Sequence, residues 1–258
     1  MPFPQPYSRK VPEITLLFWI VKLLTTAMGE ATSDFLVAKF NPYLAVFLGG
    51  VALAIALYIQ FSVRKYYAWV YWLSVSLVAV FGTMAADGLH IQLHVPYIAS
   101  TAFFAIVLAA VFIAWHKSEK TLSIHSINTR RREVFYWLTV LSTFALGTAA
   151  GDLTATTFGL GYFTAGLLFF GLILIPAVAY WATHKHEVLW FWMAYVLTRP
   201  LGASFADWTS KPKSVGALSY GDGHVAIVLA LIIFILVAYL AMSHQDIKAL
   251  THRVSKQK

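Results

Sequence analysis

Charged side chains interrupt an apolar stretch near the start of the chain. Within residues 16–36, LLFWIVKLLTTAMGEATSDFL, the charges are Lys22, Glu30 and Asp34. Each charge at the centre of a bilayer costs about 2.5–3.5 kcal/mol on insertion scales, so a simple anchor is expected to lack them. Carboxylate oxygens are suitable ligands for Mg²⁺, Ca²⁺ or Mn²⁺. Glu30 and Asp34 are therefore the first candidates for binding a cation.

The pattern W-x9-G-x4-D occurs four times and contains one of these carboxylates. Its members are Trp19, Gly29 and Asp34; Trp72, Gly82 and Asp87; Trp137, Gly147 and Asp152; and Trp192, Gly202 and Asp207. Four copies at one spacing indicate internal duplication. Since a helix rises about 1.5 Å per residue, Trp and Asp lie about 22 Å apart, with each Asp toward the outer end of its helix. The glycines predict close approach between neighbouring helices.

Differences between the copies predict where the site departs from fourfold symmetry. Only the first copy has Glu after Gly, and the equivalent residues are Thr83, Thr148 and Ala203. A site around Glu30 and Asp34, completed by Asp152 or Asp207, fits this asymmetry. The predicted metal ligands are Glu30, Asp34, Asp87, Asp152 and Asp207.

Two basic residues within the apolar stretches, Lys22 and Arg199, are candidates for charge pairing or gating. On a straight helix Lys22 lies about 12 Å from Glu30, which argues against a direct pair. Pro200 follows Arg199 and lacks an amide donor, so the sequence predicts an irregular helix just before Asp207.

A second, weaker metal site is suggested by DGLHIQLHVP, residues 87–96. Here Asp87, His90 and His94 would share one face of a continuing helix, and paired histidines on a helix can bind Zn²⁺. Gly88 and Pro96 argue against such a regular helix. Surface histidines in an outer loop are the alternative.

The composition identifies the surroundings of these residues as a membrane. The chain has 59% hydrophobic and 12% charged residues, whereas soluble domains carry about 25% charged residues. With no cysteine, disulfides and thiolate metal sites are excluded. Stretches long enough to span a bilayer cover residues 14–36, 43–63, 67–89, 97–115, 134–157, 162–182, 188–207 and 224–243.

The basic residues predict the orientation of these eight spans. Fourteen Lys and Arg residues lie in the two tails and in the loops after even-numbered spans, and three lie in the other loops. By the positive-inside rule both termini are cytoplasmic. The tails contribute Arg9, Lys10, Lys248, Arg253, Lys256 and Lys258. Because the charge of +8 is explained by topology, nucleic acid is not expected as a partner.

The predicted fold is an all-α integral membrane domain over residues 1–258, with four parallel helical hairpins around a pseudo-symmetry axis along the membrane normal. The hairpins cover about residues 13–65, 66–116, 131–185 and 186–243, residues 116–132 form a cytoplasmic linker, and residues 244–258 form a cytoplasmic tail. The first apolar stretch is too long for a signal peptide and belongs to the repeat, so it is expected to be a retained span.

The segments GEATSDFL, GTMAADGLH, GTAAGDLTA and RPLGASFADW, each after its Trp, resemble those of a known family. This is a functionally uncharacterised family of bacterial integral membrane proteins with four tandem two-span repeats of unknown function. The resemblance covers about residues 13–243 and implies a multi-pass protein of the bacterial inner membrane. It implies no particular activity.

The function predicted from the residues is transport of a cation, in the first place a divalent metal such as manganese, with coupling to protons. One alternative is a structural or partner-binding protein in which the repeated Asp residues fix helix packing. Another is an intramembrane enzyme acting on lipid or quinone, although no nucleophile, zinc-protease or phosphate-loop motif supports catalysis. No enzyme activity and no cofactor are expected. The expected partners are the lipid bilayer and a metal cation or proton, and a homo-oligomer is compatible with the sequence.

Overall fold

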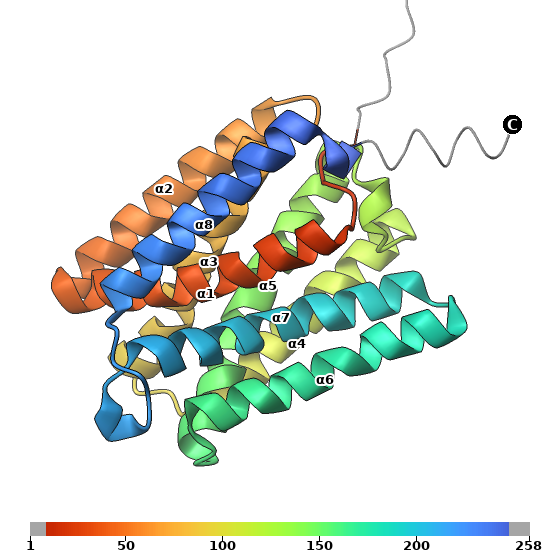
Figure 1. Ribbon diagram of the computed structural model, residues 1–258. Coiled ribbons are helices and arrows are strands. Elements are labelled where there is room, and N and C mark those ends of the chain that lie inside the picture. The colour runs from red at the N-terminus through yellow and green to blue at the C-terminus, as the bar shows by residue number, and fades with distance from the viewer. Residues whose placement is uncertain (1–8, 248–258) are drawn as a thin grey trace, which may run out of the picture.

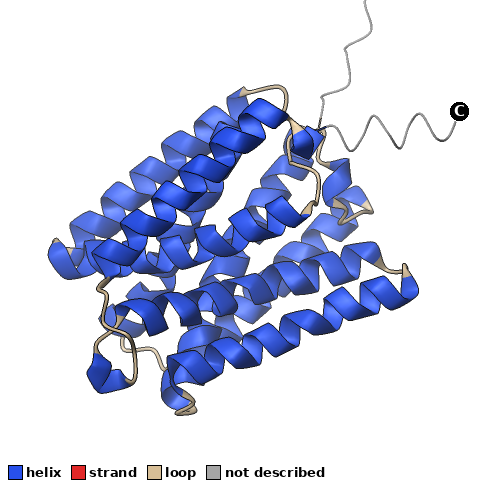
Figure 2. Ribbon diagram, viewed as in Figure 1, coloured by secondary structure: helices blue, strands red, loops and turns tan. Residues whose placement is uncertain are grey.

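The structure, a computed structural model, describes residues 9–247. Lys248, Arg253, Lys256 and Lys258, which contribute to the predicted orientation, lie outside the described residues. Within the described part the chain forms eight long helices and no strand (Figures 1 and 2). They are α1 (Leu16–Lys39), α2 (Pro42–Ser62), α3 (Ala68–Asp87), α4 (Tyr97–Glu119), α5 (Arg130–Asp152), α6 (Gly161–Thr183), α7 (Glu187–Ser210) and α8 (Asp222–Ser243).

Local sequence signals define several helix starts. The Thr15 side chain accepts a hydrogen bond from the Phe18 amide at 3.2 Å before α1, and Thr129 accepts one from the Arg132 amide before α5. Asn41 caps α2 in the same way, with Pro42 at the first helical position. Such residues satisfy amide groups that have no partner within the helix.

The odd-numbered helices form a closed inner ring. α1 packs against α3, α3 against α5, α5 against α7, and α7 against α1. Each even-numbered helix lies outside this ring, mainly against the odd helix that follows it, and α8 completes the arrangement by packing against α1. Figure 1 shows this last contact, with the red and blue ends of the chain side by side.

Burial differs between the two sets of helices. In their most apolar windows, α3 and α5 are 61% and 67% buried, whereas α2, α4 and α6 are each 22% buried and α8 is 17% buried. Large apolar residues such as Phe47, Phe170 and Ile235 therefore face outward. An outer surface of this kind suits contact with lipid.

The repeated glycines join neighbouring helices of the ring. A Cβ atom added to Gly29 would lie 2.8 Å from the carbonyl carbon of Ala79, and one added to Gly82 would lie 2.7 Å from Phe144 Cβ. Gly147 meets Arg199 and Gly202 meets Thr26 in the same way. In each case the glycine contacts the residue three positions before the glycine of the next copy, and the fourth copy contacts the first. The predicted close approach at the glycines is confirmed.

Six helical segments are long and apolar enough to cross a membrane, among the residues that the structure describes. They are Pro42–Ser62, Ala68–His90, Tyr97–Glu119, Arg130–Thr157, Gly161–Thr183 and Asp222–Ser243. The other two long helices, α1 and α7, each have 24 residues. They carry Lys22, Glu30 and Arg199 on buried positions, which lowers their apolar character.

Helical irregularity does not occur where the sequence predicted it. Helix α7 is one continuous α-helix with Pro200 inside it, so the irregular segment predicted just before Asp207 is not observed. Instead, π-helical turns follow Asp87 and Asp152, over Gly88–Gln92 and Leu153–Thr157. Turns of this type are frequent at functional sites.

The connection between the two halves of the chain is shorter than predicted. Helix α4 continues to Glu119 and α5 begins at Arg130, which leaves ten residues, 120–129, instead of 116–132. Ile124 and Ile127 in this connection are buried, and the Ile127 carbonyl accepts a hydrogen bond from the Lys10 amide at 3.2 Å. This connection therefore packs against the N-terminal segment and covers one end of the ring.

Candidate functional site

The residues that follow the repeated glycines converge inside the ring. Glu30 on α1, Thr83 on α3 and Thr148 on α5 all meet the guanidinium group of Arg199 on α7, and Ala203 is the fourth equivalent residue. Arg199 Nη2 donates to Glu30 Oε2, to Thr83 Oγ1, and to Thr148 Oγ1 at 2.7 Å. Residues that are 51 to 169 positions apart in the chain thus form one polar layer.

Arg199 reaches this layer because Gly147 has no side chain. A Cβ atom at Gly147 would lie 2.5 Å from Arg199 Cβ, within the space that the arginine stem occupies. Arg199 is completely buried, and its Nη1 donates to the Thr26 carbonyl at 3.2 Å. Arginine in the fourth copy and Glu30 in the first are therefore complementary departures from the repeat, because a buried ion is stabilised only when it is paired and hydrogen-bonded.

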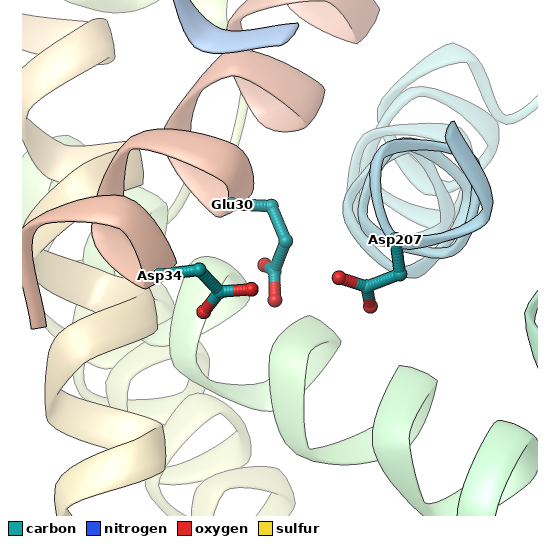
Figure 3. A group of neighbouring side chains, drawn as sticks. All are labelled: Glu30, Asp34 and Asp207. Carbon is teal, nitrogen blue, oxygen red and sulfur yellow. The ribbon is translucent and has the colours of Figure 1, made fainter. Parts of the chain in front are cut away.

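Three carboxylates gather immediately beside this layer. Glu30 and Asp34 from α1 and Asp207 from α7 each offer an oxygen, and the three oxygens lie within 4.8 Å of one another. Figure 3 shows the three side chains pointing toward a common space between the two helices. Oxygen atoms from three carboxylates at this separation can coordinate a divalent cation.

Lys211, the residue after α7, pairs with this cluster. Its ammonium group forms an ion pair with Asp34 and lies 3.9 Å from Asp207 Oδ1 and 3.8 Å from Asp222 Oδ1. Burial lowers the pKa of Lys211, but the neighbouring carboxylates, Asp34 first, raise it by more, so that the pKa lies above the ordinary value of 10.5. Lys211 is consequently a charged amine.

Asp207 has an unused ligand atom. Its side chain is 4% exposed, and its Oδ1 has no hydrogen-bond donor among the described residues. An unsatisfied buried oxygen costs about 1–3 kcal/mol, and more when it is charged. The Asp207 carboxylate points toward Glu30 and Asp34 (Figure 3), so a cation bound among the three residues would lie within reach of it.

Asp87 and Asp152 occupy the two remaining corners of the ring and do not join the group of three. Both are partly buried. Their carboxylates interact electrostatically with Glu30, and Asp87 also interacts with Asp152. They add negative charge near the site without direct convergence on one ligand position.

The negative charge around the site exceeds the positive charge. Among the described residues, the six carboxylates of Glu30, Asp34, Asp87, Asp152, Asp207 and Asp222 are accompanied by the two cations of Arg199 and Lys211. Like charges that lie close together disfavour ionisation unless a cation or protons compensate them. The arrangement is therefore suited to cations and protons.

Lys22 lies away from the carboxylates. Its Nζ lies 3.9 Å from the centroid of the Phe144 ring and 4.4 Å from that of the Tyr195 ring, and it has no hydrogen-bond partner among the described residues. Pairing of Lys22 with the carboxylates, considered from sequence, is not observed. Lys211 has that position instead.

The histidines are also apart from the site. His90 lies in the first π-helical turn, where its ring stacks on Tyr97 at 3.5 Å between centroids and its Nδ1 lies 2.8 Å from the Val95 carbonyl oxygen. His94 is exposed and has a φ of 56°, so the regular helix that would align it with Asp87 and His90 does not continue. The described residues place neither histidine in a group of three or more metal-ligating side chains.

An apolar cleft of about 600 Å³ opens beside the site, between α1, α6, α7 and the start of α8. Leu24, Phe170, Phe205 and Val228 contribute to its walls. No described carboxylate lines it. The cleft is therefore separate from the carboxylate cluster.

Two residues beside the cluster, Lys211 and Asp222, could not be assigned to it from the sequence, where Lys211 counts only among the basic residues of the outer loops. One local signal indicates a pair of Lys211 with Asp207, because the two are four residues apart and can face the same side of a helix. The pairing of Lys211 with Asp34, on another helix, has no such local signal.

The apolar outer helices and the buried polar layers together define a multi-pass α-helical membrane protein with a fourfold internal repeat. The family model of a repeat of unknown function (DUF347) matches residues 17–66, 70–121, 135–186 and 190–246. The chain belongs to this family, whose four copies agree with the repeat found in the sequence. No curated protein and no solved structure matches the chain.

Proposed function

We propose that this protein carries a divalent metal cation, such as Mn²⁺, across the bacterial inner membrane. The single observation that carries this proposal is the convergence of Glu30, Asp34 and Asp207, with their oxygens within 4.8 Å and a buried Asp207 oxygen that lacks a donor. Intramembrane carboxylates that face the interior of a bundle typically mark ion paths.

The proposed topology has eight spans with both termini in the cytoplasm. Helices α1 and α7 have 24 residues each, which corresponds to about 36 Å and is long enough to cross the hydrocarbon layer. Their charged side chains Lys22, Glu30 and Arg199 are buried in the ring, and their neighbours α3 and α5 are apolar enough to span. In this orientation the pseudo-symmetry axis lies along the membrane normal and the carboxylate cluster lies toward the outer surface.

Lys211 supports a cycle in which a tethered cation alternates with the substrate. When no metal is bound, its ammonium group neutralises Asp34; when Mn²⁺ binds to Asp34 and Asp207, repulsion moves the ammonium group toward Asp222, 3.8 Å away. The Glu30–Arg199 pair stays in place and orients Glu30. Protons that bind to the emptied carboxylates reset the site.

The proposal is tested with protein reconstituted in phosphatidylethanolamine and phosphatidylglycerol vesicles that contain a Mn²⁺-sensitive dye. Wild-type protein is expected to move Mn²⁺ down an imposed gradient, and Asp207→Asn is expected to abolish both this flux and stabilisation by Mn²⁺. Glu187→Gln is the matched control, because the Glu187 side chain is half exposed and pairs with His125, away from the site.

A structural role of the carboxylates is the second candidate, favoured by their ion pairs with Arg199 and Lys211. In that case Asp207→Asn lowers stability in the absence of metal and leaves any response to Mn²⁺ unchanged. Failure of the wild-type protein to bind or move Mn²⁺, Mg²⁺, Ca²⁺ or Zn²⁺ would refute metal transport.

A further inference from the structure

The apolar cleft beside the carboxylate cluster has no part in the proposed cation transport. Helices α8, α1, α7 and α6 lie side by side in that order (Figure 1), so α1 and α7 form the floor of the cleft and α8 and α6 form its two sides. The volume of about 600 Å³ is within the range of about 300–1,000 Å³ that is typical of ligand pockets. The cleft is therefore large enough to hold part of a lipid molecule.

The floor of the cleft is the seam between the first and fourth copies of the repeat. A Cβ atom added to Gly202 on α7 would lie 2.8 Å from Thr26 Cβ on α1, so the two helices are in close contact here. Gly202 itself lines the cleft, together with its neighbours Leu24, Ala27 and Leu201. No described carboxylate lines it. A molecule in the cleft would therefore contact the two helices that carry the carboxylate cluster without contacting the carboxylates.

The polar residues that line the cleft lie at one of its ends. Thr209 is in the last turn of α7, Tyr220 precedes α8 and His224 is in the first turn of α8. The Tyr220 amide donates a hydrogen bond to the Thr209 carbonyl at 3.0 Å. All other lining residues are apolar or glycine. From Thr209 to Leu201 the cleft extends about 12 Å along α7, which is close to the thickness of about 15 Å of one hydrocarbon leaflet.

The surroundings of the cleft determine what can fill it. Its sides belong to outer helices with outward-facing apolar residues, among them Phe170 at 51% and Val228 at 55% exposure. Water in a protein needs about two to four polar partners, which the apolar part of the cleft lacks. An empty space would deprive the wall atoms of their dispersion contacts. In a bilayer, the acyl chains of the surrounding lipid are the apolar groups available to fill it.

The polar end of the cleft is complementary to a lipid phosphate. The loop that joins α7 to α8 begins and ends here, because the Gly221 amide donates to the Ser210 carbonyl at 3.0 Å. Lys213 in this loop is exposed and forms no ion pair among the described residues, whereas Lys211 is paired with Asp34. Positive side chains near the membrane surface attract the phosphate groups of lipids.

We infer that the cleft is a binding site for one acyl chain of a phospholipid, with the lipid phosphate at the end formed by His224 and the loop of Lys213. The chain lies between Phe170 and Val228 and extends along α7 toward Leu201. The inference goes beyond cation transport and does not depend on it. The proposed topology serves only to name the leaflet, which is the outer one.

The test uses the full chain in vesicles of phosphatidylethanolamine and phosphatidylglycerol that contain a trace of phosphatidylethanolamine with a diazirine midway along one acyl chain. After illumination, the labelled segments are identified by mass spectrometry. The lining segments of α1 and α7 are expected to take up at least about fivefold more label than the outward faces of α2 and α4, for a preference of about 1 kcal/mol. Equal labelling of all these surfaces would show ordinary boundary lipid and would overturn the inference.

Val228→Trp and its neighbour Ile227→Trp form a matched pair. Val228 lines the cleft, whereas Ile227 is 62% exposed and does not line it. The indole of Val228→Trp should occupy the cleft and lower the labelling of α7 at least about fivefold, while Ile227→Trp should stay within about twofold of wild type. Both positions are exposed, so both variants should fold. Equal labelling of α7 in the two variants would overturn the inference.

The role of the phosphate is tested with a diacylglycerol probe that has the same acyl chains. The phospholipid probe should label the cleft about fivefold more strongly than this probe, since a basic residue near the surface contributes about 1 kcal/mol. Lys213→Gln should lower this preference, and Lys39→Gln, exposed at the end of α1, is the matched control. Equal labelling by the two probes in wild-type protein would overturn the assignment to a phospholipid.

Two other occupants are distinguished by the same experiment. Loss of label on addition of excess ubiquinone, but not of excess unlabelled phosphatidylethanolamine, would assign the cleft to a quinone and overturn the inference. Protection of the cleft in a dimer would assign it to a second copy of the chain, with the same consequence. Failure of Mn²⁺ transport would overturn the proposed function and leave the labelling result unchanged.

Discussion

The buried pair of Glu30 and Arg199 gives the sharpest test of how the ring is held together. Arg199→Met removes the guanidinium group that joins the polar layer and leaves the Glu30 carboxylate with the Thr83 hydroxyl, which donates to Glu30 Oε2 at 3.4 Å. Both charged side chains are almost completely buried, at 4% and 0% exposure. Removal of one partner of such a pair typically costs about 3–5 kcal/mol, because the other charge remains buried and uncompensated.

A double-mutant cycle isolates this effect. Glu30→Gln and Arg199→Met should each lower the free energy of unfolding by about 3–5 kcal/mol, whereas the double variant should lose less than the sum by at least about 2 kcal/mol, within the range for coupled neighbours. Unfolding is measured in mixed detergent micelles by loss of helical circular dichroism. Arg131→Met is the control, because that side chain is 72% exposed and a surface pair contributes about 1 kcal/mol or less.

Additive losses in the cycle would contradict the reasoning. They would mean that Glu30 and Arg199 stabilise the protein independently. The same result would remove the argument that the glutamate of the first copy and the arginine of the fourth are complementary. A single-variant loss as small as that of Arg131→Met would show that water or another ion compensates the remaining charge.

Three further perturbations test the close contact at Gly29, the pairing of Lys211 with the carboxylates, and the buried carboxyl group of Asp246. Gly29→Ala would place a Cβ 2.8 Å from the Ala79 carbonyl carbon and should lower the free energy of unfolding in detergent by about 1–3 kcal/mol. Gly171→Ala is the control and should be neutral or stabilising, because nothing lies within 4 Å of the added Cβ. Equal effects of the two variants would contradict the packing argument. Lys211→Met should tighten Mn²⁺ binding about tenfold, equivalent to about 1.4 kcal/mol, in calorimetric titration, and weaker binding would exclude competition for the carboxylates. Burial raises the pKa of Asp246 above its ordinary 3.8. The stability that the protonated Asp246 contributes is therefore full below pH 3.8 and decreases as pH rises through the folded-state pKa. Asp246→Asn should remove this pH dependence from melting temperatures measured between acid and neutral pH, and an unchanged dependence would contradict the assignment.

The repeat and the helical class could be predicted from the sequence because they depend on local features. The fourfold spacing of Trp, Gly and Asp defines equivalent positions without any knowledge of the fold, and apolar stretches of about 20 residues can bury themselves in lipid only as helices or as strands of closed barrels. Local reasoning failed at Pro200, where neighbouring helices hold α7 continuous. It failed also at the π-helical turns, which have no reliable local signal.

The composition of the site could be predicted in part. Glu30 was singled out because it differs from its equivalents in the other copies. Arg199 differs in the same way, since the other copies have Thr26, Ala79 and Phe144 at that position. The same comparison would therefore have indicated a charge complementary to Glu30. Lys211 could not be assigned to Asp34 in this way. Their contact depends on the position of a loop after α7 relative to α1.

The sequence by itself determined the number of copies, their helical class and the set of charged residues in the apolar stretches, because periodicity and hydropathy act along the chain. Only the tertiary structure decided which of those charges meet. Closure of the ring brings α7 against α1, so that Arg199 contacts Glu30 and Lys211 contacts Asp34, while Lys22 is left between two aromatic rings. Electrostatic energy depends on distance and on the surrounding dielectric, and both are properties of the packed helices.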